Sequence, residues 1–337
     1  MHSASQLCFN SKEPSALAGL IISAGDRVLT IGADFRTLRR NARDWATRGT
    51  MTIRNIAVVG SGLMGRGIAH VSALGGYRTT VVDISDEILQ KAHANIRSEM
   101  EKAVSIGKLT AEQKDQGLSL LVLNTNLEKA AEDADLVIEA VPEEMKLKID
   151  TFSRLDRSAP AHAIFASNTS SMSVTEMAAV TGRAPRFCGM HFFNPVHKMK
   201  LLEIVVGLET APDTIQVAEQ VGRQMGKDTV VIKESPGFIT SRINAMIGNE
   251  AFYMLEAGVA SAADIDKAVK LGLNHPMGPF EMADLVGLDT RLHTLEYLEK
   301  TLGEKFRPCP LMVQYVKAGR LGRKVGRGVY DYPADKK

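Results

Sequence analysis

The chain has 337 residues, of which 45% are hydrophobic and 24% are charged. This length is enough for two domains of ordinary size, each with its own core. The 41 Lys and Arg residues nearly balance the 39 Asp and Glu residues, so the formal net charge is only +2. No run of five like charges occurs. The charge pattern therefore argues against nucleic acid or an anionic membrane as partners.

The cysteine content and the hydropathy pattern indicate a cellular compartment. The three cysteines, Cys8, Cys188 and Cys309, are an odd number, lie far apart and form no C-x-x-C motif. They predict neither a disulfide framework nor a thiolate metal site, which fits a reducing environment. No apolar run reaches the roughly 18 to 20 residues that a membrane span needs. We therefore expect a cytoplasmic protein.

The first 50 residues match nothing in the rest of the chain. The Arg-rich stretch over residues 36–43 is similar to a transit peptide, but Asp26, Asp34 and Asp44 are unusual in one. A clear strand pattern starts soon after Met51. We expect residues 1–50 to be an extra segment that is poorly ordered or that precedes the true start of the protein. The working enzyme would then begin at Met51.

Strand and helix patterns alternate from residue 53 onward. Residues 53–59 form an apolar run rich in β-branched side chains, typical of a buried parallel strand. A glycine-rich turn, a helix that ends at Gly75 and Gly76, and a strand over residues 79–83 follow. Asp86 is expected to cap a long helix that reaches about Gly107. Further short strands are expected over residues 120–123, 136–139, 163–167, 187–190, 204–206 and 230–232. This alternation predicts an α/β, Rossmann-like doubly wound sheet over residues 51–235.

The strand signal ends at Ser235-Pro236-Gly237. Apolar residues from Phe238 to Leu255 recur at helical spacing, and more helical patterns follow. Helices are expected over residues 263–271, 280–286, 292–302 and 311–318. Residues 236–337 are therefore predicted to form a second, all-α domain.

A dinucleotide-binding motif follows the first strand. The sequence Gly60-Ser61-Gly62-Leu63-Met64-Gly65 has G-x-G-x-x-G spacing between a strand and a helix, and Asp83 ends the second strand. In this motif the first glycine allows a tight turn, the second lets the backbone approach a pyrophosphate, and the third allows close helix packing. Asp83 would bind the adenosine ribose 2′-hydroxyl and repel a 2′-phosphate. The sequence therefore predicts NAD rather than NADP, with FAD as a minor alternative.

Polar clusters lie where strands are expected to end, which is the ligand crevice of such a sheet. They are residues 167–171, residues 191–195, Glu203 and residues 235–238. An alcohol dehydrogenase needs a base for the hydroxyl proton, and a histidine held by a carboxylate provides one. A lone histidine beside two phenylalanines is more often a core residue, but His191 and Glu203 together form a candidate pair. The other histidines show no metal-binding spacing, so we expect no metal.

The order of these motifs resembles the L-3-hydroxyacyl-CoA dehydrogenase family, in particular its bacterial 3-hydroxybutyryl-CoA dehydrogenase branch. The resemblance covers about residues 53–332 and includes His275-Pro276-Met277-Gly278-Pro279-Phe280 and residues 322–328. It implies that His191 is the catalytic base, that Glu203 orients it, and that Ser170 contacts the substrate 3-oxygen near the nicotinamide. The residues expected to bind NAD are Gly60, Ser61, Gly62, Leu63, Met64, Gly65, Asp83, Glu143, Lys148, Ser170, Asn194 and Lys324.

One position departs from the family pattern. The family often has an asparagine that polarises the 3-oxygen where this chain has Ser241. Ser241 could donate a hydrogen bond directly or through water, or a helical neighbour such as Asn244 could take over the role. Asn249 lies about 12 Å along the helix axis and cannot reach the same point. We favour Ser241 as the fourth catalytic residue.

The resemblance implies reversible, NAD-dependent oxidation of a short-chain L-3-hydroxyacyl-CoA to the 3-oxoacyl-CoA, as in fatty-acid or butanoate metabolism. It also implies an acyl-CoA thioester substrate and a homodimer formed through the helical domain. Two alternatives stay open: a β-hydroxyacid dehydrogenase acting on a free acid, which would use a lysine instead of the His–Glu pair, and a non-catalytic NAD-binding structural protein. Cations on the helix after Asp86 could meet the CoA phosphates, but a solvated charged face explains them equally well.

Overall fold

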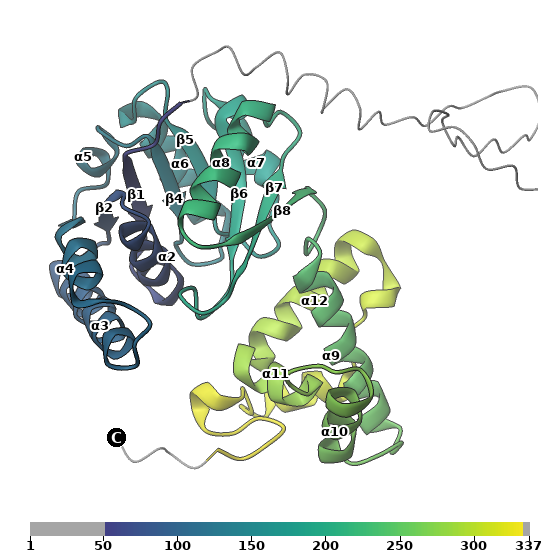
Figure 1. Ribbon diagram of the computed structural model, residues 1–337. Helices are drawn as coiled ribbons and strands as arrows, with labels where there is room; N and C mark the ends of the chain where they lie inside the picture. The colour runs from purple at the N-terminus through teal and green to yellow at the C-terminus, as the bar shows by residue number, and fades with distance from the viewer. Residues whose placement is uncertain (1–50, 333–337) are drawn as a thin grey trace, which may run out of the picture. The chain divides into compact units, whose positions relative to one another are not determined.

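The computed structural model describes residues 51–332, so the expectation for residues 1–50 lies outside the described residues. The α/β part contains one sheet of eight strands in the order β3-β2-β1-β4-β5-β6-β7-β8 (Figure 1). The strand order reverses between β1 and β4, as in a doubly wound fold. All neighbouring strands are parallel except β6 and β7. The strands are β1 (Asn55–Val59), β2 (Arg78–Val82), β3 (Leu121–Asn124), β4 (Leu136–Glu139), β5 (Ile164–Ser167), β6 (Phe187–Phe192), β7 (Leu201–Val206) and β8 (Asp228–Lys233).

Helices cover both faces of this sheet (Figure 1). They are α2 (Leu63–Leu74), α3 (Asp86–Ser105), α4 (Ala111–Ser119), α5 (Leu127–Ala131), α6 (Met145–Ser158), α7 (Val174–Ala179) and α8 (Pro212–Gln224). On β1, Ile56 and Val58 pack in one core with α2, α3 and α8, whereas Ala57 and Val59 pack in another with α5, α6 and α7. Successive strand side chains point to opposite faces, and both faces of β1 are buried. This explains the continuous apolar run and confirms the predicted fold.

The start of α3 differs from the expectation. Ser85, not Asp86, is the N-cap, because its side chain accepts a hydrogen bond from the Ile88 amide at 3.3 Å. Asp86 is the first residue of the helix, where its carboxylate interacts favourably with the positive end of the helix dipole. Both residue types favour a helix start, and only the backbone geometry distinguishes their roles.

Asp135 holds the start of β1 in place through hydrogen bonds. One carboxylate oxygen accepts the amides of Arg54 and Asn55 at 2.8 and 2.9 Å, and the other lies 3.0 Å from His162 Nε2. Burial alone would raise the pKa of Asp135, but these hydrogen bonds outweigh it and hold the pKa below its usual value. The ionised carboxylate therefore stabilises the fold above about pH 4, and this contribution disappears as the pH falls through the lowered pKa.

Asp135→Asn keeps an acceptor but removes the charge. We expect it to lower the free energy of unfolding by about 1 kcal/mol at pH 7, because hydrogen bonds to charged groups are the stronger ones. Urea unfolding of both proteins at several pH values measures the difference. The difference should be present from pH 8 down to pH 5 and should shrink below about pH 4. A difference that does not change with pH would show that the charge is unimportant.

The second part is helical, as predicted. It contains α9 (Thr240–Glu256), α10 (Ala262–Gly272), α11 (Pro279–Val286), α12 (Leu288–Leu302) and α13 (Pro310–Lys317). Its core includes Phe252, Phe280, Leu295 and Phe306, all fully buried, and the rings of Phe252 and Phe280 meet edge to face at 5.1 Å. Within residues 51–332, no helix has the length and apolar character needed to cross a membrane.

Candidate active site

The glycine-rich loop has the geometry that its motif predicts. Gly60 has φ +92°, and a Cβ there would lie 2.6 Å from the Ala140 carbonyl oxygen. A Cβ on Gly65 would collide with the Gly60 carbonyl oxygen, so these two glycines are required by close packing. Gly62 differs, because a Cβ there would meet no atom within 4 Å. Its backbone faces open space, which is where the motif brings a pyrophosphate.

The helix that follows the loop has an open, positively polarised end. Gly62 is the N-cap of α2, no side chain caps the helix, and its first turn contains no acidic residue. The first amides of α2 are therefore available to an anion. Beside them, the Ser61 amide and hydroxyl both donate to Asp83 Oδ2 at 2.7 Å. Asp83 therefore lies beside the loop, and a carboxylate has acceptor sites left for a ribose hydroxyl.

The structure brings His191 and Glu203 together through the only antiparallel pairing among the described strands. The two residues lie directly opposite each other on β6 and β7. Nδ1 of His191 is 2.7 Å from Oε2 of Glu203, and the two side chains are 5% and 1% exposed. A carboxylate partner favours the tautomer with the proton on Nδ1, which leaves the Nε2 lone pair as a base. The sequence spacing suggested this pair, and the strand register produces it.

Three further residues contact the pair of His191 and Glu203. Thr240, the first residue of α9, donates from its amide to Glu203 Oε1 at 3.2 Å and from its hydroxyl to Oε2 at 3.3 Å. The rings of Phe193 and Phe238 lie 4.4 and 5.7 Å from the imidazole. Thr240 is not among the residues predicted from the sequence. Its only signal was a hydroxyl at the start of a predicted helix, immediately after the Pro-Gly-Phe motif.

A second group of residues predicted to bind the cofactor also lies close together. Glu143 Oε1 accepts the Thr169 hydroxyl at 2.5 Å and the Ser170 amide at 2.9 Å, and Glu143 Oε2 lies 3.1 Å from Lys148 Nζ. Glu143, Lys148 and Ser170 therefore belong to one network. Ser170 is exposed, whereas the Lys148 side chain is only 1% exposed. In this structure Lys148 can act on a ligand chiefly by holding Glu143 in place.

Glu139 is also part of this network, and it is a further residue that is not among those predicted from the sequence. It ends β4, and its buried carboxylate accepts hydrogen bonds from Lys148 Nζ at 2.7 Å, the Ser167 hydroxyl at 2.6 Å and the Val141 amide at 2.7 Å. Burial raises the pKa of Glu139, and the Lys148 ammonium opposes this shift. An acidic residue at the end of an apolar strand was its only sequence signal.

Within residues 51–332, three predicted residues make no hydrogen bond or ion pair with these groups. Ser241 is half-buried in the first turn of α9, and Asn194 is exposed shortly after β6. Lys324 lies in the helical part, where its ammonium is 2.7 and 2.6 Å from the two carboxylate oxygens of Asp289. Their roles toward substrate and cofactor stay predictions.

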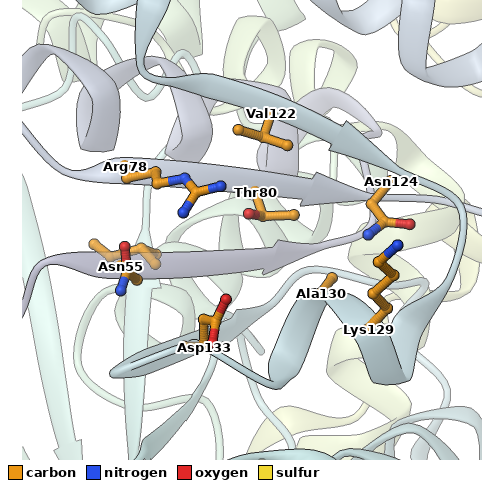
Figure 2. A pocket seen from close by; sticks show the side chains of 10 residues that line it. Asn55, Arg78, Thr80, Val122, Asn124, Lys129, Ala130 and Asp133 are labelled. Atoms are coloured by element: carbon orange, nitrogen blue, oxygen red, sulfur yellow. The ribbon is translucent and has the colours of Figure 1, made fainter.

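A hollow of about 290 Å³ lies elsewhere, against β1, β2, β3 and α5 (Figure 2). The side chains of Arg78, Thr80, Lys129 and Asp133 line it. None of the predicted catalytic or cofactor-binding residues is among its lining residues. The active site is therefore located by the motifs at the strand ends and not by this hollow.

Comparison with known families matches almost the whole described chain. Residues 55–235 match the model of the 3-hydroxyacyl-CoA dehydrogenase NAD-binding domain, and residues 237–332 match that of the 3-hydroxyacyl-CoA dehydrogenase C-terminal domain. The first match ends at residue 235 and the second begins at residue 237.

Individual relatives agree with this match. A probable 3-hydroxybutyryl-CoA dehydrogenase of Bacillus subtilis is 44% identical over 283 residues, which are 84% of this chain and 98% of the relative. The mitochondrial hydroxyacyl-coenzyme A dehydrogenase of Sus scrofa is 38% identical over 306 residues, which are 88% of this chain and 97% of the relative. The crystal structure of (S)-3-hydroxybutyryl-CoA dehydrogenase from Ralstonia eutropha is 44% identical, has a TM-score of 0.81, and is matched over 83% of this chain and 99% of that one. The chain therefore belongs to the 3-hydroxyacyl-CoA dehydrogenase family and is an NAD-dependent oxidoreductase.

Proposed function

We propose that this enzyme reversibly oxidises short-chain L-3-hydroxyacyl-CoA, such as 3-hydroxybutyryl-CoA, to the 3-oxoacyl-CoA. The observation that supports this most strongly is the buried pair of His191 and Glu203. It provides a base with one free ring nitrogen, on a sheet whose glycine loop is shaped for a dinucleotide. The two relatives named 3-hydroxybutyryl-CoA dehydrogenase support the short acyl chain.

Each residue of the proposed site has its own role in the oxidation. Nε2 of His191 takes the proton of the 3-hydroxyl group, and Glu203 stabilises the imidazolium that forms. NAD, when bound, accepts the hydride from C3. Ser170 and Ser241 donate hydrogen bonds to the 3-oxygen as it becomes a carbonyl oxygen. Thr240 donates hydrogen bonds to both oxygens of Glu203, so the carboxylate stays aligned with the imidazole.

A kinetic series tests the proposal. The purified chain is assayed for NADH formation with 3-hydroxyacyl-CoA substrates of increasing length and with free 3-hydroxybutyrate. We expect the highest kcat/KM for the short thioesters and little turnover of the free acid. Preference for the free acid would favour a β-hydroxyacid dehydrogenase. An absence of turnover at every chain length would instead favour a non-catalytic NAD-binding protein.

Cofactor choice depends on the charge of Asp83. We expect Asp83→Asn to lower the kcat/KM ratio of NAD over NADP by at least about tenfold, because the carboxylate no longer repels a 2′-phosphate. The asparagine oxygen can still accept the Ser61 amide, so the loop is retained. Initial rates with both cofactors give the ratio. Ser61→Ala is the matched control, since it removes one loop hydrogen bond without changing the charge. An equal loss of preference in both variants would contradict the role of the charge.

We also propose a homodimer formed through the helical part. Ile239, Ile243 and Met246 recur at helical spacing at the start of α9 and are 45%, 55% and 41% exposed. Such an apolar stripe is typical of a protein interface. Light scattering should give a molecular mass twice that of the chain, and Ile243→Glu should lower it toward that of one chain. A single-chain mass for the unmodified protein would refute the dimer.

A further inference from the structure

Three metal-ligating side chains meet outside the active-site groups. His70 lies on α2, Glu99 on α3, and His197 on the segment between β6 and β7. Nδ1 of each histidine is 3.4 Å from the same oxygen, Oε2 of Glu99. The imidazole rings are stacked with their centroids 5.4 Å apart and their planes 14° from parallel. One ligand atom from each residue lies within 4.8 Å of the other two.

The separations between the histidine nitrogens and the Glu99 oxygen fit metal coordination better than they fit hydrogen bonds. An N–H···O hydrogen bond is normally 2.7–3.2 Å long, so both contacts of 3.4 Å are loose. In a tetrahedral zinc site, bonds of about 2.05 Å place neighbouring ligand atoms about 3.3 Å apart. The two N···O separations match this edge. Two imidazoles and one carboxylate also make up a common three-residue ligand set of zinc proteins.

We propose that His70, Glu99 and His197 bind a divalent transition-metal ion, with Zn²⁺ as the best fit and water as the fourth ligand. The ion would join α2, which begins at the dinucleotide loop, to α3 and to the segment that contains Asn194. None of the three ligands belongs to the residues assigned to catalysis or NAD binding. The sequence analysis expected no metal because these ligands come from three distant segments and form no motif.

The surroundings permit both entry and binding. The His70 side chain is 3% exposed, whereas those of Glu99 and His197 are 31% and 25% exposed, so solvent reaches the site from one side. Burial lowers the pKa of His70 and of His197, which favours the uncharged rings that metal binding requires.

Nearby positive charges act against binding and limit the affinity. Lys227 is buried and acts on both histidines, but its ammonium is already held by the carbonyl oxygens of Val196 and Met199. Lys108 and Lys198 also act on His197, but both side chains are exposed and their charges are screened by solvent. Glu99 is the only carboxylate in the cluster and balances part of this charge.

Cobalt provides a direct test that does not depend on activity. The full chain without a polyhistidine tag is titrated with Co²⁺, and we expect the visible absorption of four-coordinate Co²⁺ to saturate at one ion per chain. Zn²⁺ should displace the Co²⁺ and raise the melting temperature. Octahedral, weakly absorbing Co²⁺, or no saturable binding, would overturn the proposal.

Two variants locate the ion. His197→Ala and Glu99→Gln change partly exposed residues and should leave the fold intact, which the melting temperature without metal verifies. Each should weaken Co²⁺ binding at least about tenfold and abolish the Zn²⁺-dependent rise in melting temperature, because even the loss of an outer partner costs this much. His162→Ala is the matched control, since His162 pairs with Asp135 alone, and it should bind Co²⁺ like the unmodified chain. Unchanged binding in the first two variants would place the ion elsewhere and refute the site.

Discussion

Replacing His191 by alanine is expected to lower kcat for NADH formation from 3-hydroxybutyryl-CoA by at least about 100-fold, since a positioned general base contributes 10²–10⁴-fold. The imidazole is buried between Phe193 and Phe238 and held by Glu203, so water cannot easily replace it in the same position. The dinucleotide loop lies at the end of a different strand, so NAD binding should change little. Steady-state kinetics and a separate titration with NAD measure the two effects.

His93→Ala is the matched control for this experiment. His93 lies on α3 and is only partly buried, so its loss should leave kcat unchanged. If His191→Ala kept more than about a tenth of the activity, the assignment of the base would be wrong. If NAD binding failed together with turnover, the variant would report damage to the fold and not the loss of a base. Thermal unfolding of the variant then distinguishes local from global damage.

Lys148→Met is expected to destabilise the protein by about 3–5 kcal/mol, because it leaves the Glu139 carboxylate buried without its positive partner. Both side chains of this pair are at most 1% exposed. The hydrogen bonds from Ser167 and Val141 remain but cannot neutralise the charge. Urea unfolding at pH 7 measures the loss. The penalty should decrease as the pH falls, because the pKa of Glu139 is already raised and protonation removes the buried charge.

Two comparisons make this prediction specific. The double variant with Glu139→Gln and Lys148→Met should lose less stability than Lys148→Met alone, since no unpaired charge is left. Lys324→Met breaks an ion pair with Asp289 whose side chains are 47% and 39% exposed, and it should cost at most about 1 kcal/mol. Equal losses of unfolding free energy for Lys148→Met and Lys324→Met would show that burial does not determine how strongly these ion pairs stabilise the protein.

The sequence predicts the fold well because its signals are local. The apolar run before Gly60 and the change to helical spacing after Pro236 each depend on a few adjacent residues. The family comparison supports the predicted fold class. The start of α3 was misassigned by one residue, because Ser85 and Asp86 both favour a helix start.

The candidate site was less predictable where it depends on distant residues. His191 and Glu203 are predictable from their residue types, but the register that places them opposite each other on the antiparallel strands β6 and β7 has no local sequence signal. Thr240 and Glu139 were missed for a similar reason. An ordinary polar residue becomes important only when the fold brings it to a buried carboxylate or ammonium group.

The antiparallel pairing of β6 and β7 also determines which insertions and deletions the enzyme can accept. His191 and Glu203 face each other because of the strand register. A one-residue deletion inside β7 before Glu203 would turn the later side chains to the opposite face of the sheet and move the carboxylate away from the imidazole. The segment between the two strands contains Phe193, Asn194 and His197, so its length is constrained as well. In natural or engineered relatives, β6, β7 and the segment between them should accordingly keep their lengths.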